Sequence, residues 1–103
     1  MTTAKVIRYR TSPEQADGNE QLIREVFAEL AEGGPSGLRY AVFRLDDGVS
    51  FLHVAILDGD VNPLSSSPAF AAFQAGIGER CVEGPTPADA TMVGSYGLGP
   101  SPS

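Results

Sequence analysis

The strongest constraint on the fold is a pair of β-rich segments separated by one tight turn. Residues Leu38–Leu45 and Val49–Leu57 are rich in β-branched and aromatic side chains, and Asp46-Asp47-Gly48 lies between them. A two-residue Asp47-Gly48 turn of type I′ fits the twist of an antiparallel hairpin. The sequence therefore predicts a β-hairpin in which Asp46 faces Val49.

This register divides the hairpin side chains between two faces of a sheet. One face carries three cross-strand pairs, namely Arg44–Phe51, Val42–His53 and Tyr40–Ala55. The opposite face is mostly apolar and carries Arg39, Ala41, Phe43, Leu45, Leu52, Val54 and Ile56. We expect the apolar face to pack against the helices, and the face with Tyr40, Arg44 and His53 to be turned toward a partner subunit.

A first strand is expected over Lys5–Arg10, followed by a helix with two competing starts. Ser12-Pro13-Glu14-Gln15 is a capping box with proline at the first helical position. Asp17-Gly18-Asn19-Glu20 is a second capping box. Because Gly18 costs a helix about 1 kcal/mol, we expect the main body from about Gly18 to Glu32. Gly33-Gly34-Pro35 ends the helix.

The second half of the chain predicts a further helix and a last strand. Ser67-Pro68 opens this helix, which carries an inner stripe of Phe70, Phe73 and Ile77 and ends at Arg80-Cys81. The last strand is expected over Ala90–Leu98. The order strand, helix, two strands, helix, strand predicts a ferredoxin-like α+β fold, a four-stranded antiparallel sheet with two helices on one face.

One domain is expected over residues 1–98, with a disordered tail over residues 99–103. Two helices cover one face of a four-stranded sheet, yet both hairpin faces are largely apolar or aromatic. A bare apolar face of this kind is usually buried by another surface, and symmetric pairing of two copies is the commonest solution. We therefore expect a homodimer.

Three features together resemble the dimeric α/β-barrel superfamily, and within it the antibiotic-biosynthesis-monooxygenase-like proteins. They are the element order, the segment Phe51–Asp58, and the segment Ser67–Phe73, since many relatives carry Ser-Pro-x-Phe at the start of the second helix. The resemblance implies a cofactor-independent monooxygenase-like enzyme acting on a small aromatic or polyketide-like substrate. The superfamily also contains isomerases and proteins of no known activity. A non-catalytic small-ligand-binding or structural homodimer is the alternative.

His53 is the only histidine, so any imidazole general base must be this residue. Tyr40 and Arg44 lie diagonally across from it in the expected hairpin. The three side chains could take a proton from a phenol or enol and hold the resulting anion. The structural alternative is that His53 and Arg44 are hydrogen-bonded residues of a dimer interface.

Asn19 lies on the same helix face as Leu22 and Ile23, where its amide could orient a substrate carbonyl. The alternative is a cap or first-turn residue, which asparagine favours. Cys81 is interpreted as a small core residue. Tyr9 and Tyr96 are expected on neighbouring strands in the centre of the sheet, where each could line a pocket, although packing is the simpler role.

Composition excludes several classes of function. The formal net charge of −6 argues against nucleic-acid and anionic-membrane partners, which require clustered basic residues. One histidine, one cysteine and scattered aspartates match no metal-ligand spacing, so neither a metal nor a cofactor is expected. A lone cysteine and no apolar segment of membrane length indicate a cytoplasmic protein.

Overall fold

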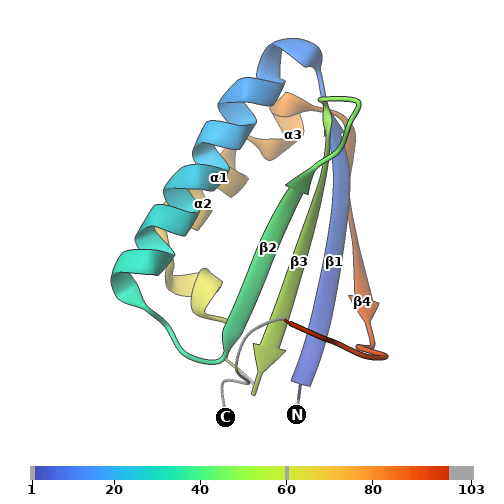
Figure 1. Cartoon of the computed structure of the whole chain (residues 1–103). Helices are drawn as coiled ribbons and strands as arrows, with labels where there is room; N and C mark the ends of the chain where they lie inside the picture. Colours follow the sequence, from blue (N-terminus) through green and yellow to red (C-terminus); the bar gives the residue numbers. More distant parts are fainter. Residues whose placement is uncertain (1, 60, 98–103) are drawn as a thin grey trace.

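The computed structural model describes residues 2–59 and 61–97. Its elements are β1 (Thr2–Thr11), α1 (Pro13–Gly33), β2 (Leu38–Arg44), β3 (Ser50–Asp58), η1 (Pro63–Ser66), α2 (Pro68–Ala75), α3 (Ile77–Arg80) and β4 (Cys81–Ala90). The strands form one antiparallel sheet in the order β2-β3-β1-β4. Figure 1 shows the helices lying along one side of this sheet. The ferredoxin-like α+β fold is confirmed.

The hairpin register is the one that the sequence predicts, but the turn is of another type. Arg44 pairs with Phe51, and Tyr40 pairs with Ala55. The turn is closed by the amide of Gly48, which donates to the carbonyl of Leu45 at 2.9 Å, and only Gly48 has a positive φ, of 77°. A type I′ turn also needs a positive φ at its first central residue, so this prediction is wrong.

The Asp47 carboxylate explains why another turn forms without a change of register. It accepts hydrogen bonds from the amides of Val49 and Ser50, at 2.9 and 2.8 Å, and from the Ser50 hydroxyl at 2.5 Å. These bonds, led by the one from the Ser50 hydroxyl, lower the pKa of Asp47 to about 2. A side chain that bonds its own backbone a few residues on is a common turn device.

Helix α1 begins at the earlier of the two predicted starts, so the expected body from Gly18 is wrong at its N-terminus. Pro13 occupies the first turn, and Gly18 lies inside the helix with nothing within 4 Å of where a Cβ would be. The helix therefore continues through Gly18 despite the low helix propensity of glycine. The predicted end is confirmed, because Gly34 takes the left-handed conformation and donates to the carbonyl of Leu30.

The second helical segment starts as predicted but is broken before its expected end. The Ser67 hydroxyl accepts from the amide of Phe70 at 3.0 Å and donates to the Glu29 carboxylate of α1, which ties the two helices together. The helix stops at Gly76, and a single turn, α3, follows. Cys81 is thus the first residue of a strand, where it packs against the core.

The last strand, β4, is displaced toward the N-terminus from the predicted Ala90–Leu98. It contains Gly84, Pro85 and Pro87, and a register shift opposite Arg8 and Arg10 accommodates the extra residues. Prolines are tolerated here because β4 is an edge strand with one partner only. Residues 91–97 are not in a strand, and Tyr96 is fully exposed, so its predicted position in the centre of the sheet is wrong.

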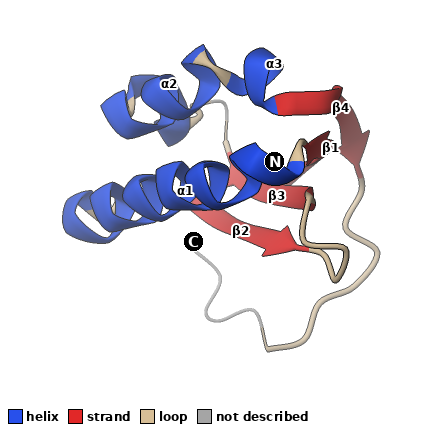
Figure 2. Cartoon of the chain, turned by 90° about the horizontal axis from the view of Figure 1, so that it is seen from above, coloured by secondary structure: helices blue, strands red, loops and turns tan. Residues whose placement is uncertain are grey.

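The helices cover the opposite face from the one expected. Tyr9, Phe51 and Phe73 belong to one buried cluster with residues of α1, and His53 is also buried on this side. The face that carries Ala41, Phe43, Leu52 and Val54, which we call the open face, has no helix over it (Figure 2). Phe43 is 53% exposed there. The chemically interesting residues therefore face the helices.

Candidate functional site

The centre of the candidate site is the single histidine, which lies between two tyrosines on neighbouring strands. His53 Nε2 is 2.8 Å from the hydroxyl of Tyr9, and His53 Nδ1 is 2.6 Å from the hydroxyl of Tyr40. Tyr9 comes from β1, His53 from β3 and Tyr40 from β2. Alternation along paired strands places all three on the helix-covered face. Both ring nitrogens thus already have a hydrogen-bond partner.

A second part of the site reaches from Tyr9 to the end of α3. Asn19 Nδ2 donates to the Tyr9 hydroxyl at 2.9 Å, and Arg80 Nε donates to Asn19 Oδ1 at 2.9 Å. Arg80 also donates to the carbonyl of Phe73 at 2.5 Å. Asn19 is 0% exposed. Five side chains, Tyr40, His53, Tyr9, Asn19 and Arg80, therefore form one continuous set of hydrogen bonds, which we call the buried polar network.

Gly76 makes room for the arginine of this network. A Cβ at position 76 would lie 2.9 Å from Arg80 Nη1, closer than such contacts normally come. The guanidinium also lies over the ring of Phe73, with its carbon 5.2 Å from the ring centre. The break between α2 and α3 therefore has a structural use, because it lets a charged side chain fold back into the protein.

Burial keeps the titratable members of the network neutral near pH 7. It lowers the pKa of His53 to about 4, because the imidazolium form would lose its hydration. It raises the pKa of Tyr9 and of Tyr40 well above the usual value, for the same reason applied to the phenolate. The Tyr9 hydroxyl's hydrogen bond with Asn19 opposes part of that rise in pKa. The guanidinium of Arg80 is thus the one charged group among the five side chains of the network.

An apolar cavity adjoins the network on the side of α2. Its volume is about 250 Å³, which is slightly below the range typical of drug-sized ligands. The walls are Ile7, Tyr9, His53, Phe70, Phe73, Gln74, Ile77, Pro85 and Pro87. Here Tyr9 and His53 supply the polar groups from the network. A planar ligand of one or two rings suits a space of this size, with Phe70 and Phe73 in its wall.

A surface groove lies at the other end of the tyrosine–histidine row. It runs between α1 and β2, has a volume of about 290 Å³, and is lined by Phe27, Leu30, Ala31, Gly34, Pro35, Leu38 and Tyr40. We call it the α1–β2 groove. The ring of Phe27 stacks on that of Tyr40 with 5.1 Å between ring centres. Tyr40 therefore connects the buried network with the molecular surface.

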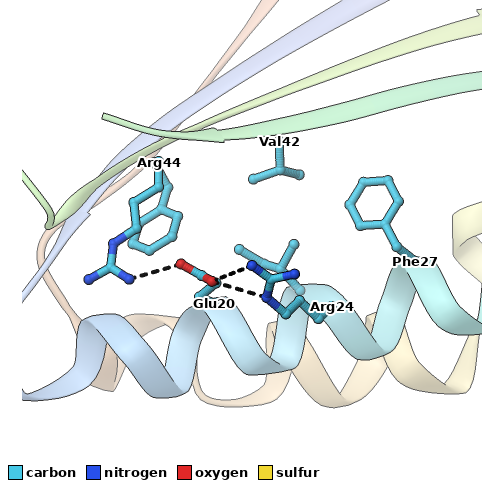
Figure 3. Close-up of a pocket in the computed structure, with 7 residues that line it drawn as sticks. Glu20, Arg24, Phe27, Val42 and Arg44 are labelled. Atoms are coloured by element: carbon cyan, nitrogen blue, oxygen red, sulfur yellow. Dashed lines mark hydrogen bonds and ion pairs between the residues drawn. The ribbon is translucent and has the colours of Figure 1, made fainter. Parts of the chain in front are cut away.

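Arg44, a predicted site residue, does not join the network. It packs against the N-terminal half of α1, where it pairs with Asp17 at 3.1 Å. It also pairs with Glu20 at 2.9 Å (Figure 3). Glu20 also pairs with Arg24 at 2.8 Å. These hydrogen bonds, first that from Arg44, lower the pKa of Glu20. Both arginines are neutralised by carboxylates of α1, so Arg44 is bound in a surface ion-pair cluster.

Of the four predicted site residues, the structure thus brings together His53, Tyr40 and Asn19. Sequence reasoning did not place Tyr9 and Arg80 in the site. Tyr9 could have been identified once β1 was paired with β3 in register, because Tyr9 then faces Phe51 beside His53. For Arg80 the only signal in the sequence was Gly76, which breaks the helix and leaves room for the arginine side chain. Asn19 is not a cap, because α1 begins six residues earlier.

Metal binding gains no support from the described residues. Within residues 2–59 and 61–97, no group of three or more histidine, cysteine, aspartate or glutamate side chains is arranged to hold an ion. No helix in this part of the chain is long and apolar enough to cross a membrane.

No family model and no curated protein sequence matches the chain. Solved structures share its fold over nearly the whole length. One is a protein from Bacteroides thetaiotaomicron provisionally named an antibiotic biosynthesis monooxygenase, with a TM-score of 0.76 and 14% identity over 89% of this chain and 90% of that one. Another is Rv0793 from Mycobacterium tuberculosis, with a TM-score of 0.74 and 15% identity over 92% and 98%.

A third similar structure is a mutant of SnoaB from Streptomyces nogalater, a cofactor-independent oxygenase. It has a TM-score of 0.62 and 16% identity over 93% of this chain and 97% of that one. At these identities the likeness concerns the fold. The chain therefore has the ferredoxin-like fold of antibiotic-biosynthesis-monooxygenase-like proteins, as the sequence resemblance predicts.

Proposed function

We propose that the chain is a cofactor-independent, monooxygenase-like enzyme that acts on a small aromatic or polyketide-like phenol or enol. The observation that carries this proposal is the pairing of an apolar cavity with one polar wall, formed by Tyr9 and His53. A flat ring would lie against Phe70 and Phe73, with its hydroxyl toward Tyr9. The fold it shares with SnoaB, a cofactor-independent oxygenase, supports the same class of reaction.

The chemistry that suits this arrangement begins with loss of the hydroxyl proton. The resulting phenolate or enolate is electron-rich enough to be attacked by dioxygen without a metal or flavin. For a phenol oxidised to a quinone, one molecule of dioxygen is consumed, one oxygen atom enters the ring, and the other leaves as water with the two hydrogens lost. The role of the protein is to hold the ring, accept the proton and exclude bulk water.

We further propose that the active form is a homodimer formed through the open face. The depression between β2 and β3 on this face has a volume of about 420 Å³ and is lined by Arg39, Tyr40, Ala41, Phe43, Val54 and Ile56. The Nε of Arg39 is buried without a hydrogen-bond partner among the described residues. A second copy could cover this apolar surface and supply the missing acceptor. Light scattering that gives only a monomer at micromolar concentration would contradict this pairing.

The function is tested by oxygen uptake. Metal-free protein is mixed with 1-naphthol, and dioxygen consumption is followed with an electrode. We expect turnover that is lost in a His53→Ala variant with an unchanged circular dichroism spectrum. Tyr96→Phe, which alters a fully exposed tyrosine, is the control and should keep wild-type turnover. Full activity of folded His53→Ala would remove His53 from the mechanism.

A second candidate function is ligand binding without turnover. For either function we propose a cytoplasmic location, where the lone thiol, Cys81, would stay reduced. The observation that favours it is that both nitrogens of His53 already have hydroxyl partners, so the imidazole is satisfied without a substrate. Saturable binding of 1-naphthol without oxygen uptake in any variant would select this alternative.

A further inference from the structure

The hydrogen bonds of the buried polar network have a defined direction, which follows from counting donors and acceptors. Arginine has donors only, so the atom of Asn19 that faces Arg80 must be its oxygen. The amide nitrogen of Asn19 therefore faces Tyr9 and donates to the hydroxyl oxygen. Tyr9 cannot donate back to this nitrogen. Among the partners of Tyr9 in the described residues, the acceptor left for its own proton is His53 Nε2.

This direction continues through the histidine to Tyr40. Since Nε2 accepts from Tyr9, the proton of the neutral imidazole lies on Nδ1, and Nδ1–H donates to the Tyr40 oxygen at 2.6 Å. An imidazolium is disfavoured because its Nε2–H would compete with the Tyr9 hydroxyl proton for the same space. The Tyr40 hydroxyl is left as a donor, and the described residues show no acceptor for it.

We propose that Tyr9, His53 and Tyr40 form a proton relay between the cavity beside α2 and the α1–β2 groove, and that Asn19 and Arg80 fix its resting hydrogen-bond direction, which leads from the cavity to the groove. The proposal deepens and rests on the proposed function, since it names the path by which the substrate proton leaves. Asn19 and Arg80 are positioning residues, because they act on the reacting proton through Tyr9.

Each step of the relay moves one proton and leaves no charge on Tyr9, His53 or Tyr40. A phenol in the cavity gives its proton to the Tyr9 oxygen, while Tyr9 passes its own proton to His53 Nε2. His53 releases the Nδ1 proton to the Tyr40 oxygen, and Tyr40 passes its proton to a water in the groove. The substrate is left as a phenolate that accepts a hydrogen bond from Tyr9. The reverse sequence returns a proton to the reduced oxygen that leaves as water, and it restores the original tautomer of His53.

The two ends of this path open on different parts of the surface. Tyr9 and His53 line the cavity, and Tyr40 lines the α1–β2 groove. Burial supports transfer by linked steps, because it lowers the pKa of His53 and raises those of both tyrosines, so that a lasting ion on any member is disfavoured. A proton can thus cross the core while dioxygen and the ring stay in the apolar cavity.

The first test reads the tautomer directly and needs no substrate. The chain has one histidine, so a long-range proton–nitrogen NMR spectrum of the imidazole contains a single set of signals. At pH 7 we expect Nδ1 to be protonated and Nε2 to be bare. An Nε2–H tautomer or an imidazolium would overturn the direction that we infer.

A variant that reverses the direction gives the sharpest check. In Asn19→Asp the side chain keeps its shape but becomes an acceptor only, so it accepts from Arg80 and also from the Tyr9 hydroxyl. His53 Nε2–H must then donate to Tyr9, and we expect the opposite tautomer in the same spectrum. An unchanged tautomer in the folded variant would show that Asn19 does not set the direction.

The third test removes the last proton acceptor of the relay, the Tyr40 hydroxyl, and leaves the direction of the other hydrogen bonds unchanged. It remains available if Asn19→Asp fails to fold. The probe is 4-nitrophenol, whose absorbance reports its ionisation while it is bound. In Tyr40→Phe the proton from Nδ1 has no acceptor, so ionisation would have to leave a buried imidazolium. We expect the ionisation constant of the bound probe to fall about tenfold, and the matched Tyr96→Phe variant to behave as wild type.

The outcomes separate the relay from the function. Equal ionisation of the bound probe in wild type and Tyr40→Phe would overturn the exit through Tyr40, even if oxygen uptake is found. Failure of 4-nitrophenol to bind any variant would contradict the proposed cavity function, while the tautomer would still decide the direction of the network.

Discussion

The two faces of the sheet do not follow the simple rule that the more apolar face is the buried one. The helix-covered face contains Tyr9, His53 and Tyr40 together with the buried Asn19 and Arg80 of the helices. The open face contains the exposed Phe43 among other apolar side chains. Polar groups are thus buried within the chain where they bond one another, and apolar groups are left at the surface. The path of the chain decides which face the helices cover. The polar side chains on that face must then find hydrogen-bond partners inside the protein.

The reason lies in the handedness of the two crossovers. Strands β1 and β2 both run antiparallel to β3, so α1 connects two parallel strands, and α2 and α3 likewise connect β3 to β4. Such connections are almost always right-handed. Once the strand order is fixed, both crossovers place their helices on the same face, whichever side chains it carries.

The largest expected difference between the faces is in the free energy of unfolding after loss of an aromatic ring. Phe73 is 5% exposed against the helix-covered face, and Phe73→Ala should cost about 4 kcal/mol in urea denaturation. Phe43→Ala on the open face should cost under about 1 kcal/mol in dilute protein. A loss at Phe43 that grows with protein concentration would indicate that a second copy covers this face.

The next effect concerns the polar part of the covered face. Asn19→Ala removes the only acceptor of Arg80 Nε among the described residues and one of the two hydrogen-bond partners of the Tyr9 hydroxyl. We expect a loss of about 3 kcal/mol in the free energy of unfolding. If this variant unfolds at the wild-type urea concentration, the buried polar network does not contribute to stability as described.

A pH effect follows from the low pKa of His53. The unfolded chain binds a proton at this residue as the pH falls below its ordinary pKa of 6.5, whereas the folded chain does so only near pH 4. The unfolded state therefore binds more protons between these values, and stability falls as the solution is acidified. We expect a loss of about 2–3 kcal/mol across this window. The measurement is urea denaturation at several pH values, and a His53→Gln variant should lack this component.

The smallest effect tests the packing of Arg80 with a matched pair of glycines. Gly76→Ala places a Cβ 2.9 Å from Arg80 Nη1, whereas a Cβ at Gly78 meets nothing within 4 Å. We expect Gly76→Ala to lower the free energy of unfolding by about 1 kcal/mol and Gly78→Ala to leave it unchanged or slightly raised. Equal effects of the two substitutions would show that Gly76 makes no special room for the guanidinium.

Local patterns predicted the hairpin and its register, because β propensity and a single short turn leave one pairing that keeps like side chains on one face. They failed for β4, whose prolines and glycine argue against a strand. The reason is tertiary, since an edge position next to β1 needs hydrogen bonds on one side only. Residues 91–97 have a better strand composition, yet Ala90, which pairs with Ala4, is the last paired residue of β4.

For the site, the sequence alone determined that His53 and Tyr40 lie on one face of the hairpin, because Tyr40 pairs with Ala55, two residues after His53. It also determined that Asn19 lies on the inner face of α1. It could not show that Arg80 joins them, because that contact depends on a helix break at Gly76 and on the packing of α3 against α1. It also could not tell which sheet face the helices cover. Periodicity sorts side chains into two sets, but the handed path of the chain decides which set is buried within the subunit.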